Sequence, residues 1–292
     1  MRALVVVASL TACFSKPPPP PNGATDGGRD GAPSIDGSTT TDGPAPCAHW
    51  GPFGIPTQIL IQALANTGAQ NVTVSSDGLD LLFDQGATFY ESLRATTGGS
   101  FTQVGTVLGF GSAPVQGAWL STDHLILFYI NSSMLFVTHR SALDSAFLTP
   151  GVPLIAGADD AAATNDRLRV VISSNNTLRL VKLTTADDPT GATEGALLDN
   201  SPNEGDTTPS IGDHGRKLVW TKTNLVQPTS SVLVEGDFDG NQLSNPHALI
   251  PDVGAFDTDP NLSDDGTTLY FTSTRNPSDT TAQLFVATRT CN

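Results

Sequence analysis

Apolar and polar residues alternate in short runs along most of this chain, and turns rich in Asp and Gly separate the runs. The pattern is clearest in residues 206–220, DTTPSIGDHGRKLVW, and residues 257–271, DTDPNLSDDGTTLYF, which align without a gap at an offset of 51 residues. Each segment contains a short strand, an Asp/Gly turn and a second strand with alternating apolar positions, which is the signature of a β-hairpin. The pattern therefore predicts an all-β fold.

Three weaker copies of this hairpin have their turns in residues 74–78, 120–124 and 163–167. In the last two, His124 and Arg167 occupy the position of the turn glycine, which puts the turn geometry there in question. A third apolar strand follows every copy, and stretches such as 100–107 and 247–250 supply a fourth. An aromatic or β-branched residue of the second strand recurs at Phe83, Tyr129, Ile172, Trp220 and Phe271.

The copies repeat every 43 to 51 residues, which is the size of a four-stranded propeller blade. An isolated blade cannot bury both faces of its sheet, whereas blades stacked in a ring cover one another and leave short edges. We therefore predict a single β-propeller with five four-stranded blades. A six-bladed ring would need a further copy, for which little chain remains.

The two ends of the repeat region are predicted to close the ring. The fifth copy has three strands before residue 290, so residues 50–56 can supply the fourth strand of the last blade. Cys47 and Cys291 lie at the ends that would meet, and a disulfide between them is expected in an oxidising compartment. It would close a loop of more than 200 residues and restrain the unfolded chain by about 4 to 5 kcal/mol in the chain-entropy model. Two free thiols are the alternative.

The last copy resembles the WD40-like, TolB-type propeller repeat. It has Pro260, Ser263, the Asp265-Gly266 turn, an apolar strand and Ser273-Thr274-Arg275 in the family's order, followed by a strand at 283–287. The copies at Gly78 and Gly215 match less fully, and the other two least. The resemblance covers the chain from about residue 50 to the end, and it implies a propeller that binds other proteins.

The N-terminal residues predict export. Residues 1–12 have a charged start and an eight-residue apolar run, too short to span a bilayer, which is the layout of a signal peptide. Leu10-Thr11-Ala12-Cys13 resembles the lipobox of bacterial lipoproteins, which implies that Cys13 is lipidated after cleavage; Phe14 favours the outer over the inner membrane. An ordinary cleaved signal or a short buried helix is the alternative.

Residues 13–46 are rich in Pro, Gly, Asp, Ser and Thr, and five prolines stand together at 17–21. Such a segment cannot form a core and is predicted to be a disordered tether. The predicted organisation is a signal peptide over 1–12, a tether over 13–46 and a propeller domain over 47–292.

Charge and composition narrow the possible partners. Fourteen Lys and Arg residues against 29 Asp and Glu give a net charge of -15, without a basic cluster, so nucleic acid is excluded as a partner. The same acidity disfavours electrostatic binding to an anionic membrane, so membrane contact is expected through the anchor at Cys13. The 28 Gly and 21 Pro residues suit many short strands and turns.

No catalytic, cofactor or metal site is predicted. The five histidines lack ligand spacing, no nucleophile elbow or phosphate loop occurs, and Asp237-Phe238-Asp239-Gly240-Asn241 fits a hairpin turn better than a calcium loop. We expect a monomeric binding module for an envelope protein or a glycan. The alternative is a carbohydrate-active or lectin-like propeller with carboxylates and an exposed Trp119 or Trp220 at the ring centre. Its glutamate would be one of Glu91, Glu194, Glu204 and Glu235.

Overall fold

We analysed a computed structural model of the chain. The chain separates into two units, Met1–Pro44 and Ala45–Asn292, and every described residue belongs to the second. The predicted signal peptide, Cys13 and the tether lie outside the described residues. No helix within the described part is long and apolar enough to cross a membrane. The described residues are 47–61, 68–75, 77–85, 88–110, 115–188, 190–199, 203–276 and 281–292.

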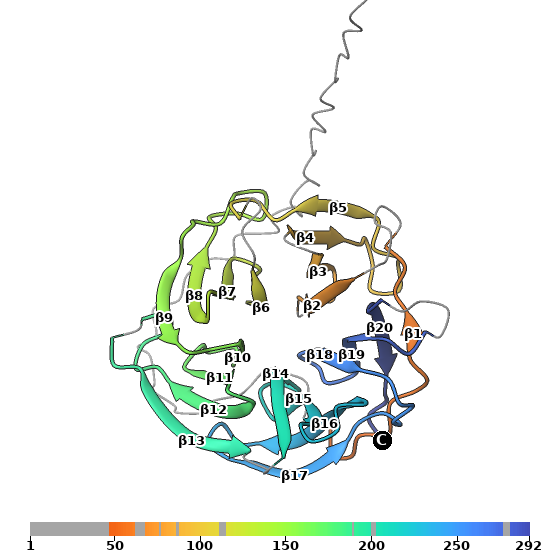
Figure 1. The fold of residues 1–292 in the computed structure, drawn as a ribbon. Helices are drawn as coiled ribbons and strands as arrows, with labels where there is room; N and C mark the ends of the chain where they lie inside the picture. Colours follow the sequence, from red (N-terminus) through yellow and green to blue (C-terminus); the bar gives the residue numbers. More distant parts are fainter. Residues whose placement is uncertain are drawn as a thin grey trace, which may run out of the picture. The chain divides into compact units, whose positions relative to one another are not determined.

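The described residues form five antiparallel four-stranded sheets arranged as the blades of a β-propeller (Figure 1), which confirms the predicted fold. Blade 1 has β2 (Ala69–Val74), β3 (Asp80–Gln85), β4 (Thr88–Leu93) and β5 (Gln103–Thr106); blade 2 has β6 (Gln116–Leu120), β7 (Ile126–Asn131), β8 (Met134–His139) and β9 (Val152–Ala156); blade 3 has β10 (Asp160–Ala163), β11 (Arg169–Ser174), β12 (Thr177–Lys182) and β13 (Thr193–Asp199). Blade 4 has β14 (Glu204–Gly212), β15 (Lys217–Asn224), β16 (Ser231–Phe238) and β17 (Leu243–Ala248); blade 5 has β18 (Asp257–Leu262), β19 (Thr268–Ser273), β20 (Gln283–Thr288) and β1 (Thr57–Gln58).

The core is divided among the interfaces between neighbouring blades. Five clusters of buried apolar side chains each join residues of two adjacent blades. The second strand of every blade is buried on both faces because a neighbour covers each side of the sheet. The recurring position of the repeat is therefore buried in all five blades, at Phe83, Tyr129, Ile172, Trp220 and Phe271.

The turns between first and second strands share one geometry in four blades despite their different residues; in blade 4, Asp213 and His214 also have positive φ. His124 and Arg167 have φ of 60° and 56°, in the left-handed region that Gly78, Gly215 and Gly266 also occupy. Such a conformation costs a non-glycine residue about 1 to 2 kcal/mol. In four of the turns, a Ser or Thr hydroxyl donates to an Asp two residues later, and that Asp accepts a backbone N–H. These bonds hold the turn in shape without glycine.

The ring closes through a strand from the N-terminal end of the domain, as predicted, but the strand is Thr57–Gln58 and so lies directly after the expected residues 50–56. In blade 5, β1 pairs with β20, and Trp50 forms an isolated bridge with Cys291. The sulfur atoms of Cys47 and Cys291 are 2.15 Å apart and their Cα atoms 5.5 Å apart, so the predicted cysteine pair lies at disulfide distance. We call this cysteine pair the latch.

Candidate functional site

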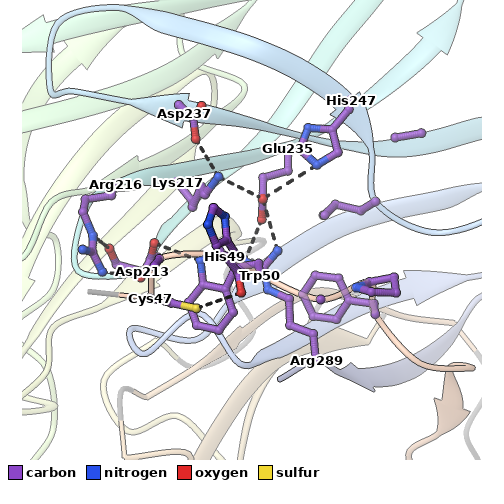
Figure 2. A pocket seen from close by; sticks show the side chains of 16 residues that line it. Cys47, His49, Trp50, Asp213, Arg216, Lys217, Glu235, Asp237, His247 and Arg289 are labelled. Atoms are coloured by element: carbon purple, nitrogen blue, oxygen red, sulfur yellow. Dashed lines mark hydrogen bonds and ion pairs between the residues drawn. The ribbon is translucent and has the colours of Figure 1, made fainter. Parts of the chain in front are cut away.

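A cavity of about 600 Å³ lies beside the latch, between blades 4 and 5 (Figure 2). We call it the latch cavity. Residues 47–53 form one wall, and the other walls come from the β14–β15 turn, the adjoining parts of β15, β16 and β17, and the residue after β20. Its size lies within the range of small-molecule sites. Its charged and aromatic lining side chains are His49, Trp50, Phe53, Asp213, Arg216, Lys217, Glu235, Asp237, His247 and Arg289.

Glu235 is the buried carboxylate of the latch cavity. Its side chain is 1% exposed, and Arg289 of the neighbouring blade places Nη1 3.1 Å from Oε1 and Nη2 2.8 Å from Oε2. Lys217 Nζ lies 3.4 Å from Glu235, and His247 Nε2 lies 4.0 Å from it. A buried carboxylate needs such partners, since an unpaired one would be strongly destabilising.

Arg289 connects this carboxylate to the wall made by the N-terminal segment. Its guanidinium lies 4.5 Å from the ring centres of both Trp50 and Phe53, and its Nε donates to the carbonyl oxygen of Gly266 at 2.7 Å. The Trp50 indole donates in turn to Asp213 at 3.3 Å. Cation–π contacts and charge-assisted hydrogen bonds thus fix the wall that the latch anchors.

The two remaining carboxylates of the latch cavity are also engaged. Asp213 accepts a hydrogen bond from Arg216 at 2.6 Å, and Asp237 accepts bonds from Lys217 at 2.6 Å and Asn245 at 2.7 Å. The hydrogen bonds from Asn245 and Lys217 lower the pKa of Asp237. The lowered pKa of Asp237 disfavours a role as a general acid, because a general acid must hold a proton near neutral pH.

The arrangement around Arg289 recurs in two other blades. Arg94, Arg140 and Arg289 each directly follow the third strand of their blade. Each Nε donates to the carbonyl oxygen of the left-handed turn residue of the same blade, at 2.6, 2.9 and 2.7 Å. Each guanidinium also covers an aromatic ring. The rings are Phe101 for Arg94, Phe147 for Arg140, and Trp50 and Phe53 for Arg289.

Two glutamates that the sequence marks as catalytic candidates therefore join neighbouring blades. Glu235 of β16 pairs with Arg289 of blade 5, and Glu91 of β4 pairs with Arg140 of blade 2 at 3.2 Å. The other two candidates pair with cations as well: Glu194 lies 3.5 Å from Arg179, and Glu204 accepts a hydrogen bond from Lys222.

The two equivalent glutamates differ in one neighbour. Next to Glu235 the first residue of the second strand is Lys217, whereas next to Glu91 it is Asp80. Burial and the charge of Asp80 raise the pKa of Glu91 to about 7, although Arg140 opposes the change. The acidic Asp80 thus occupies in blade 1 the position that the basic Lys217 occupies in blade 4, so Glu91 has a neighbour of like charge and Glu235 one of opposite charge.

The ring centre brings carboxylates together without room for a sugar. Its cavity of about 20 Å³, between the first strands of all five blades, holds about one water. Asp160 and Asp259 line it, and burial raises the pKa of both. Trp119 and Trp220 are buried, with exposures of 8% and 0%, so neither offers a stacking face for a glycan.

The Asp237–Asn241 segment ends strand β16 and begins the hairpin turn to β17, as its sequence predicts. Asp239 Oδ1 accepts the backbone N–H groups of Asn241 and Gln242, both at 2.8 Å. Over the described ranges, no three His, Cys, Asp or Glu side chains are grouped so as to hold a metal ion.

Comparisons with known proteins match the fold alone. No protein-family model matches the sequence, and no curated protein matches it. Similar solved structures include a putative TolB from Agrobacterium tumefaciens (16% identity, TM-score 0.45, 71% of this chain and 70% of that one) and TolB from Acinetobacter baumannii (10%, 0.45, 77% and 55%). Another is hydrazine synthase from Kuenenia stuttgartiensis (13%, 0.43, 73% and 59%). The chain thus spans less than two thirds of the hydrazine synthase and of the A. baumannii TolB.

Proposed function

We propose that this chain is an exported, lipid-anchored protein of the bacterial envelope whose propeller is a non-catalytic binding module. The observation that carries the binding role is the latch cavity: a fixed space of ligand size whose buried carboxylates are all held by cations. Charged groups that are already paired and oriented recognise a ligand without rearrangement, which lowers the entropic cost of binding. The partner is an envelope protein or a glycan.

Export and anchoring are supported by two separate features. The lipobox-like residues before Cys13 provide the anchor, and dual acylation gives durable membrane attachment. The latch supports an oxidising compartment, because cysteine pairs at bonding distance persist as disulfides outside the cytosol. The outer membrane is the proposed destination, on the basis of Phe14.

Metabolic labelling with a fatty acid tests the anchor. Full-length wild type should incorporate label, and Cys13→Ala should not, because the acylated thiol is missing. Cys47→Ala is the matched control, since it removes a different cysteine and should leave labelling intact. Equal labelling of wild type and Cys13→Ala would refute the anchor.

In-cell photocrosslinking tests the binding role. A photoreactive phenylalanine analogue at His49, an exposed residue that lines the latch cavity, should give light-dependent adducts with the partner. The matched control carries the analogue at Val226, which is 67% exposed and does not line the latch cavity. The binding role at this cavity is wrong if the two positions give the same adducts, or if His49 gives none.

A further inference from the structure

The latch cavity presents hydrogen-bond donors to solvent and keeps most of its carboxylate oxygens covered. The side chains of Glu235 and Asp213 are 1% and 5% exposed, whereas those of His247 and Arg216 are 57% and 36% exposed. Asp237 is the accessible carboxylate among the described lining residues, at 47%, and each of its oxygens already accepts a hydrogen bond. A ligand that enters the cavity therefore meets Arg216, His247 and Asp237, and the oxygens of Asp237 are already occupied by Lys217 and Asn245.

The cations retain donors after their contacts within the protein are counted. Arg216 has five N–H groups, and within the described structure it donates through Nε to the Asp213 carbonyl oxygen and through Nη2 to the Asp213 carboxylate. Lys217 has three N–H groups and contacts Asp237 and Glu235. Three guanidinium donors and one ammonium donor are thus left for a ligand. His247 lies beside Glu235 (Figure 2), and its Nδ1 donates to the carbonyl oxygen of Asn245 at 3.0 Å.

From this distribution, the geometry points to a ligand that carries an oxyanion, a carboxylate or a phosphate, bound in the latch cavity by Arg216 and Lys217. An oxyanion only accepts hydrogen bonds, so it matches a site whose accessible groups donate, and a guanidinium can bind it through two parallel bonds. This inference rests on the proposed function, because it names the ligand class of the same cavity. The net charge of -15 does not prevent binding, since physiological salt screens charges beyond about 8 Å.

Titration calorimetry with matched probes tests the ligand class on the full-length protein. Galacturonate and galactose share a sugar ring and differ in the carboxylate, and inorganic phosphate supplies an oxyanion without a sugar. Galacturonate should bind about tenfold or more tightly than galactose, the scale expected for a charge-assisted pair of hydrogen bonds. If phosphate competes with galacturonate, the oxyanion alone is sufficient for recognition. If phosphate does not bind, the sugar ring of galacturonate contributes to recognition as well. Both results support the inference.

Two substitutions locate the binding. Arg216→Gln should weaken galacturonate binding about tenfold or more, because the fork that holds the anion is removed. Arg179→Gln is the control: Arg179 is similarly exposed, at 37%, is also paired with a carboxylate and lies outside the cavity, so affinity should not change. Unchanged thermal melting of Arg216→Gln verifies its fold.

Three results would overturn the inference. They are galactose binding as tight as galacturonate binding, no binding of either anionic probe at millimolar concentration, and equal galacturonate affinity in Arg216→Gln and wild type. If galactose alone binds and His49 still crosslinks, the ligand class fails while the proposed function stands. If galacturonate binds as expected but His49 yields no adduct in cells, the proposed partner role fails instead.

Discussion

Replacing Glu91 with Gln should flatten the dependence of folding stability on pH. Glu91 lies between blades 1 and 2 with a side-chain exposure of 20%, and it faces Asp80 of its own sheet and Arg140 of the next. His124 lies 3.5 Å from Asp80 and 3.4 Å from Asp77, so the same interface holds three carboxylates and two potential cations. Gln has almost the same shape as Glu but cannot ionise, which removes one titrating group.

The size of the effect follows from the pKa of Glu91. Burial and Asp80 raise this pKa from 4.5 to about 7. Each tenfold change in proton affinity corresponds to about 1.4 kcal/mol, so the whole effect is about 3 kcal/mol. Between these two pH values the folded state keeps a proton that the unfolded state has lost. The contribution of Glu91 is therefore greatest below about pH 4.5 and is lost as the pH rises to about 7.

Urea denaturation at about pH 5 and about pH 8 measures this loss. Wild type should lose more stability than Glu91→Gln between the two pH values, by about 2 to 3 kcal/mol. Asp84 and Asp206, whose pKa values are both raised to about 6 chiefly by burial, titrate in the same direction but are present in both proteins, so they cancel in the comparison. Equal losses in wild type and Glu91→Gln would show that Glu91 does not titrate with a raised pKa in the folded protein.

Three further changes test other parts of the fold. Glu235→Gln should destabilise the protein by about 3 to 5 kcal/mol in urea denaturation, because it leaves the buried Arg289 without its carboxylate, and a loss below about 1 kcal/mol would contradict that ion pair. Gly117→Ala should destabilise the fold by about 2 to 4 kcal/mol, because a Cβ would lie 2.3 Å from Asp160 Oδ1 and the residue has a φ of +52°. Gly254→Ala is the control: Gly254 has a φ of +73° but open space around it, so the loss of stability should be only about 1 kcal/mol. Equal losses in the two variants would exclude tight packing around Gly117. Reducing the latch should lower the free energy of unfolding by up to roughly 5 kcal/mol, and it should weaken galacturonate binding because one wall of the cavity is released. Calorimetry with and without reductant measures both effects. Unchanged affinity would show that residues 47–53 keep their position without the disulfide.

The blade architecture was predictable because each blade repeats a local pattern. Alternation of apolar residues identified the buried second strands, and the incomplete fifth copy identified the closing strand. The turns at His124 and Arg167 could not be judged by residue type, because the Ser or Thr and Asp beside them supply the hydrogen bonds that stabilise a left-handed residue. The local pattern thus predicts the strands, but it does not show that hydrogen bonds from neighbouring side chains allow a non-glycine residue at a left-handed turn position.

The latch cavity was not predictable, because its walls come from segments more than 150 residues apart in the chain. One signal was present: Arg94 precedes Phe101 by seven residues, and Arg140 precedes Phe147 by the same spacing. Arg289 does not show this spacing, because the rings that its guanidinium covers, Trp50 and Phe53, come from the other end of the domain. Which carboxylates would meet a cation also depends on how neighbouring blades align, which a single sequence does not encode locally.

The most direct test of ligand binding in the latch cavity uses the indole N–H signals of the three tryptophans in nitrogen-15 spectra of the full-length protein. Trp50 lines the latch cavity and donates to Asp213, Trp119 lines the ring centre, and Trp220 donates to Asp206 inside the core. On titration with galacturonate, the Trp50 signal should shift while the other two stay in place. A shift of the Trp119 signal without a shift of the Trp50 signal would place the ligand at the ring centre. Three unchanged signals at saturating galacturonate would show that the ligand does not bind in the latch cavity. Either result would contradict ligand binding in the latch cavity.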